Sequence, residues 1–69
     1  MQAIEIHHPC SSDLAPYIGH SARYSYLDEP GAAPSHYGTI IRNSEEECVY
    51  TKNSTYTYSG LIDTIQILL

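Results

Sequence analysis

The sequence predicts an α+β fold in which one helix packs on a mostly antiparallel sheet of four to five strands. Three observations predict it. Apolar and polar residues alternate near the N-terminus, a following segment spaces apolar residues by three and four positions, and the second half is rich in tyrosine and β-branched residues. A chain of 69 residues is expected to form one domain, residues 1–69, with a thin core.

The first strand is expected over residues 2–8, where apolar and polar side chains alternate. Ile4, Ile6 and His8 fall on one face, which is the period of a half-buried strand. Pro9 is expected to end this strand, because its nitrogen has no hydrogen to donate to a sheet.

A helix is expected over Ser12–Tyr26. Helix N-cap residues stand at its start, and Pro16 falls early enough to be tolerated. Gly19 weakens the helix. The apolar residues that recur at helical spacing are Leu14, Tyr17, Ile18, Ala22 and Tyr26.

The second half of the chain is expected to form strands. Residues 28–35, DEPGAAPS, are a predicted loop. Strands are predicted over residues 36–42, 47–52 and 55–59, and the first two pair as a hairpin around a turn at residues 43–46.

The C-terminal segment, residues 61–69, fits two structures. One face of a helix would carry Leu61, Ile62, Ile65, Leu68 and Leu69. One face of a strand would carry Ile65, Ile67 and Leu69. A strand is preferred because the segment is short and rich in β-branched residues, and the helix stays open as the alternative.

The chain is acidic, with eight Asp and Glu residues, three Lys and Arg residues and a formal net charge of −5. This charge disfavours nucleic acid and anionic lipid as direct partners and favours a basic protein surface. Glu45 and Glu47, about 6.6 Å apart on an extended chain, would present a phosphate-like row at a hairpin tip. Solubility and a solvated turn are the simpler interpretations. The acidic residues expected to bind the partner are Glu45, Glu46, Glu47, Asp28 and Glu29.

Tyrosine supplies every aromatic side chain, seven in all. Tyrosine has an apolar body and a polar tip and is enriched at protein interfaces. Tyr17 and Tyr50 are expected inside. The alternative is that all seven only pack the core and the sheet. The candidates for a contact surface are Tyr24, Tyr37, Tyr56 and Tyr58.

The stretch HHPC, His7 to Cys10, raises the question of a metal site. Neighbouring residues on a strand point to opposite faces, so His7 and His8 do not chelate one ion together. His8 and Cys10 with His20 or His36 remain a conceivable set, but zinc sites normally show two close ligand pairs. No metal and no cofactor are expected, and a metal-binding domain is kept as the least favoured alternative.

Catalytic motifs are absent from the sequence. No glycine elbow surrounds a serine, no phosphate-binding glycine loop is present, and an enzyme is not expected. The N-terminal residues lack the basic start and apolar run of a signal peptide, and the apolar tail is too short to span a bilayer. Cys10 and Cys48 are therefore expected to be reduced thiols in a reducing cytosol.

In length, acidity and lack of a catalytic motif, the chain resembles the small anti-CRISPR proteins of phages and mobile elements, in particular those against type I Cascade complexes. The resemblance lies in overall character, since that group shares no common motif. It implies a stoichiometric inhibitor that acts in the cytoplasm of a bacterial host cell and occupies a basic DNA-binding surface of a CRISPR effector complex, with DNA mimicry as one form of this. A monomer is expected rather than a dimer. The alternative is a small accessory or antitoxin-like interaction module, in which the apolar segment from Leu61 packs on a partner or in a homodimer.

Overall fold

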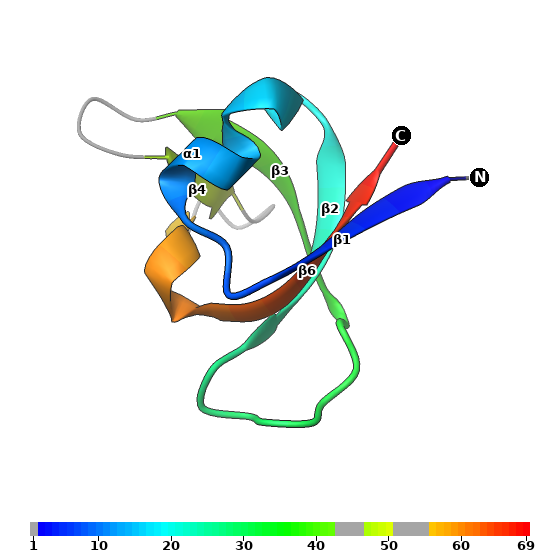
Figure 1. The fold of residues 1–69 in the computed structure, drawn as a ribbon, viewed down its shortest axis with the longest axis vertical. Coiled ribbons are helices and arrows are strands. Elements are labelled where there is room, and N and C mark those ends of the chain that lie inside the picture. The colour runs from blue at the N-terminus through cyan, green and yellow to red at the C-terminus, as the bar shows by residue number, and fades with distance from the viewer. Residues whose placement is uncertain (1, 43–46, 51–55) are drawn as a thin grey trace.

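The structure is a computed structural model that describes residues 2–42, 47–50 and 56–69 (Figure 1). All paired strands are antiparallel, in the order β1-β6-β2-β3-β4-β5. The α+β class and the antiparallel sheet are confirmed, and the described residues form six strands where four to five were expected. The elements in chain order are β1 (Ala3–His7), α1 (Ser11–Leu14), η1 (Ala15–Tyr17), β2 (Ser21–Tyr26), β3 (His36–Arg42), β4 (Glu47–Tyr50), β5 (Tyr56–Tyr58), η2 (Ser59–Leu61) and β6 (Ile62–Leu68).

The helix predicted over Ser12–Tyr26 is wrong for most of its length. Only α1 and the one-turn 3-10 helix η1 are helical, and the chain then enters β2. Gly19 turns the chain with a φ of 96°, and its N–H donates to the carbonyl of Ile40 at 2.7 Å. This long-range hydrogen bond starts a strand in which Ala22 and Tyr24 alternate inward and are fully buried. Tertiary pairing therefore overrides the helical spacing of the apolar residues.

The C-terminal segment forms β6, so the preferred strand is confirmed and the helix alternative is wrong. β6 lies between β1 and β2 inside the sheet, where both of its sides are hydrogen-bonded to neighbours. Ile62, Ile65 and Ile67 are buried by at least 99%. These β-branched side chains suit a central strand because it is covered on its core face.

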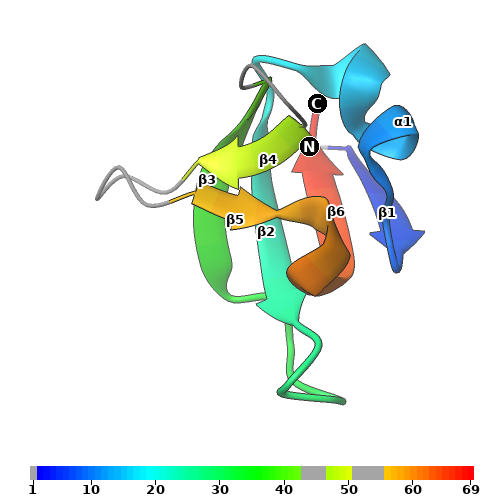
Figure 2. The ribbon, with the colours of Figure 1, turned by 90° about the vertical axis from the view of Figure 1, so that its left-hand side faces the viewer.

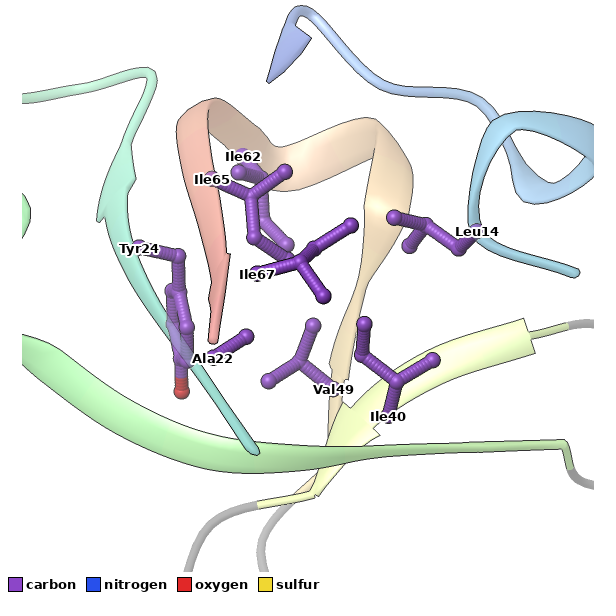
Figure 3. Packing of buried hydrophobic residues seen from close by; sticks show 8 residues of the cluster. All are labelled: Leu14, Ala22, Tyr24, Ile40, Val49, Ile62, Ile65 and Ile67. Atoms are coloured by element: carbon purple, nitrogen blue, oxygen red, sulfur yellow. The ribbon is translucent and has the colours of Figure 1, made fainter. Parts of the chain in front are cut away.

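The sheet curls around its own core, so that β4 and β5 lie across β2 and β6 in Figure 2. Leu14 of α1 is fully buried and packs into the same core, and α1 lies against β4. The helix thus closes one side of the curled sheet. The buried cluster shown in Figure 3 consists of Leu14, Ala22, Tyr24, Ile40, Val49, Ile62, Ile65 and Ile67.

Tyr24 belongs to this core, so its predicted place on a contact surface is wrong. It lies on the inward side of β2, and its hydroxyl contacts Thr57 Oγ1 at 3.3 Å. The Tyr26 hydroxyl reaches the same oxygen at 3.1 Å, and the two rings meet edge to face at 5.6 Å. Thr57 therefore satisfies the polar tips of two core aromatics, as burial of a hydroxyl requires.

Burial raises the pKa of Tyr24, because desolvation disfavours the tyrosinate. The unfolded chain then ionises at lower pH than the folded one, so this contribution to stability is present below about pH 10 and is lost as pH rises further. We expect the urea midpoint of unfolding to fall between about pH 9 and about pH 11, and to fall less in Tyr24→Phe. The exposed Tyr37→Phe variant serves as the control with the wild-type profile. An equally steep fall in Tyr24→Phe contradicts this prediction.

Candidate partner-binding surface

The outward side of the sheet is defined by the register of β3, β4 and β5. Ile40, Val49 and Thr57 face one another across these strands and are buried inward. Because side chains alternate along a strand, their sequence neighbours point to the opposite side. That opposite side carries the candidate contact residues.

Four tyrosines share this outward side and are called the tyrosine face. Tyr50 lies opposite Tyr56 in the register, and Tyr58 follows two positions later on β5. Tyr37 stands two positions before Thr39, which lies opposite Tyr50. The register therefore brings together Tyr37, Tyr50, Tyr56 and Tyr58.

Three members of the tyrosine face are exposed. The exposed fractions are 62% for Tyr37, 48% for Tyr56 and 39% for Tyr58. Tyr50 is half-buried, and its ring lies 5.6 Å from that of Tyr56. Large aromatic side chains left in solvent on one side of a sheet form a surface suited to protein contact. The prediction that Tyr37, Tyr56 and Tyr58 are available at the surface agrees with these exposures.

Tyr50 is the residue of this face that sequence reasoning missed. It was expected inside, yet its neighbour Val49 takes the inward position on β4. Tyr17, also expected inside, is half-buried and packs against the core. The signal for Tyr50 was the alternation within ECVYTK, which places valine and tyrosine on opposite sides and leaves open which side is inward.

A polar row crosses the outward side next to Tyr37. Arg23 on β2 lies opposite both Tyr37 and Gln66. Gln66 Nε2 donates to Glu5 Oε1 on β1 at 2.9 Å. Among the described residues, the buried Nε of Arg23 has no hydrogen-bond partner. The register thus places the Arg23 side chain at the border of the tyrosine face, beside Tyr37.

The predicted acidic residues are only partly placed. Glu45 and Glu46 lie outside the described residues, and Glu47 is described only as the β4 position opposite Arg42. Asp28 and Glu29 are exposed in the turn after β2. Glu29 Oε1 lies 3.7 Å from Nε2 of His36, the residue before Tyr37. The acidic turn therefore reaches the start of β3.

Each histidine of HHPC, and Cys10, contacts the carboxylate of a neighbouring Asp or Glu side chain. His7 Nε2 lies 3.1 Å from Glu5, and His8 Nε2 lies 3.2 Å from Asp63. The Cys10 backbone N–H and its thiol both donate to Asp13 Oδ2, and these bonds hold the pKa of that carboxyl below its usual value. Within the described ranges, no three His, Cys, Asp or Glu side chains converge in a way that could hold a metal ion.

Comparison with protein families, curated proteins and solved structures finds no match to this chain. None of the helices that the described residues form is long and apolar enough to cross a membrane.

Proposed function

We propose that this protein is a stoichiometric inhibitor that binds a basic, nucleic-acid-binding surface of a CRISPR effector complex in the bacterial cytoplasm and blocks DNA recognition. The observation that carries the proposal is the tyrosine face, on which three exposed tyrosines share one side of the sheet. The net charge of −5 adds the preference for a basic partner.

Tyrosines and acids contribute differently to such binding. Buried aromatic anchors supply most of the affinity of a protein interface, and tyrosine is among the residues that do so most often. Exposed carboxylates mainly speed the encounter with a basic partner and select against acidic ones. Asp28 and Glu29 are exposed in the turn after β2, where Glu29 meets His36 on the side of β3 opposite to Tyr37. We infer that they act on the encounter with the partner and lie outside the tyrosine face.

An accessory or antitoxin-like module that docks its apolar tail on a partner has less support. The isoleucines of β6 are buried in the core, and β6 pairs with two strands. Leu61 and Leu69 are the exposed apolar residues of this segment, at 55% and 51%, and they flank β6 at opposite ends. The tail therefore stabilises the fold and offers less contiguous apolar surface than the tyrosine face.

The charge part of the proposal is tested by binding to a purified, immobilised type I effector complex at about 50 mM and about 300 mM salt. We expect the association rate to fall with salt and the dissociation rate to change less. Two charge-reversal variants, Asp28→Lys with Glu29→Lys and Glu45→Lys with Glu46→Lys and Glu47→Lys, are expected to bind more slowly at low salt. Unchanged rates in both variants would remove the acidic surface from the proposal, and no binding of the complex by wild type would overturn it.

A further inference from the structure

The outer edge of β1 carries backbone groups that no strand of the described chain pairs. β1 stands at one end of the sheet, beside β6 (Figure 2). The His8 N–H donates to the Asp63 carbonyl at 2.7 Å, and the Leu69 N–H donates to the Gln2 carbonyl at 3.0 Å. In an antiparallel ladder, alternate residues bond to the same neighbour, so the even-numbered residues of β1 face β6.

The odd-numbered residues of β1 therefore aim their N–H and C=O groups away from the sheet. These residues are Ala3, Glu5 and His7, and all three are exposed. These outward N–H and C=O groups recur at every second residue, which is the spacing that an added strand needs. Extended peptides bind to sheet edges by such pairing.

We propose that this edge binds an extended, basic segment of the partner protein as a seventh, antiparallel strand. The proposal rests on the proposed function in one respect, namely that the chain works by binding a protein. The segment would alternate apolar residues with lysine or arginine, and a basic side chain would stand opposite Glu5.

Charge and burial along β1 select this kind of segment. The Glu5 side chain is 48% exposed on the outward side, where a cation opposite it would gain a cross-strand ion pair. Ile4 and Ile6 are half-buried on the core side, packed against the core. A docked strand with apolar residues on that side would cover them further.

A second copy of this chain fits the edge poorly. The twofold antiparallel register that pairs all five residues of β1 places Glu5 directly opposite Glu5 of the other copy. Like charges directly opposite one another destabilise a strand pair. The same glutamate that repels a second copy attracts a basic strand.

Amide hydrogen exchange of the full chain, measured residue by residue by NMR, tests the proposal. The probe is a synthetic peptide of alternating valine and lysine, and the matched control is the same peptide with glutamate in place of lysine. In the free protein, we expect slow exchange at Ile4 and Ile6 and fast exchange at Glu5 and His7. At about 90% occupancy by the lysine peptide, exchange at Glu5 and His7 is expected to slow about tenfold, since only the free form exchanges.

The Glu5→Lys variant tests whether the charge of Glu5 selects the peptide. Wild type is expected to bind the lysine peptide about two- to fivefold more tightly than the glutamate peptide, and Glu5→Lys is expected to reverse that order. The proposal would be overturned if neither peptide changed the exchange rates at Glu5 and His7. Protection that rises with protein concentration without peptide would also overturn it, in favour of a second copy. Peptide binding by a protein that fails to bind the effector complex would leave this edge site standing and reject only the proposed function.

Discussion

Gly38→Ala is expected to lower the free energy of unfolding by about 3 kcal/mol, the upper end of the usual cost of overpacking. A Cβ at Gly38 would overlap the backbone carbonyl of Tyr50 and stand 2.7 Å from Val49 Cγ1. Backbone atoms and a buried valine cannot move aside without separating β3 from β4. A chain of 69 residues has a small margin of stability, so this loss is a large part of the total.

The control for this prediction is Gly60→Ala. A Cβ there meets no heavy atom within 4 Å, and the backbone of Gly60 has no positive φ. We expect its free energy of unfolding to stay within about 0.5 kcal/mol of wild type in urea titrations. Similar stability of the two variants would show that β3 and β4 do not approach each other as closely as the structure has them.

Replacing the three exposed tyrosines together is expected to weaken binding to the effector complex by about 100-fold or more. Truncation of one well-packed aromatic anchor costs about 2 kcal/mol or more, which is about 30-fold in affinity, so one such anchor and a smaller loss at a second account for the effect. The variant is Tyr37→Ser with Tyr56→Ser and Tyr58→Ser. All three side chains point outward, so the inward core of Ile40, Val49 and Thr57 is kept. The measurement is the equilibrium affinity for the immobilised complex, with circular dichroism to verify the fold.

A matched control removes exposed apolar surface elsewhere. Ile18→Ser with Leu61→Ser changes side chains that are 42% and 55% exposed and lie outside the tyrosine face. We expect the affinity of this variant to stay within about threefold of wild type. A large loss here together with full affinity in the tyrosine variant would contradict the tyrosine face as the contact and favour the apolar-tail alternative.

Local sequence patterns predicted most of the sheet. β3 has the predicted bounds, because HYGTIIR is rich in β-branched residues and follows a loop with two prolines. β1 and β6 were also expected from alternation and β-branching. What local pattern could not supply is the pairing of β2, since Gly19 bonds to Ile40 across 21 positions of sequence. The spacing of the apolar residues from Leu14 to Tyr26 fits a helix when only local contacts are considered, and the long-range contact of Gly19 favours the strand instead.

The candidate surface was predictable in composition but not in detail. Tyrosine abundance pointed to a contact surface, yet the identity of a residue does not tell whether it faces in or out. Tyr24 points inward because it shares the inward side of β2 with Ala22, two positions earlier, and reaches Thr57, which is distant in sequence. Tyr50 points outward because β4 pairs with β3 in a register that buries Val49. Both assignments depend on strand register, which long-range packing sets.

The most direct measurement is the binding of labelled target DNA to a purified type I effector complex, followed by fluorescence anisotropy while this protein is titrated in. Binding to a basic DNA-recognition surface predicts that DNA binding is lost at near-stoichiometric protein and that the triple tyrosine variant requires about 100-fold more. DNA binding that persists at a large excess of wild-type protein would contradict the proposed inhibition.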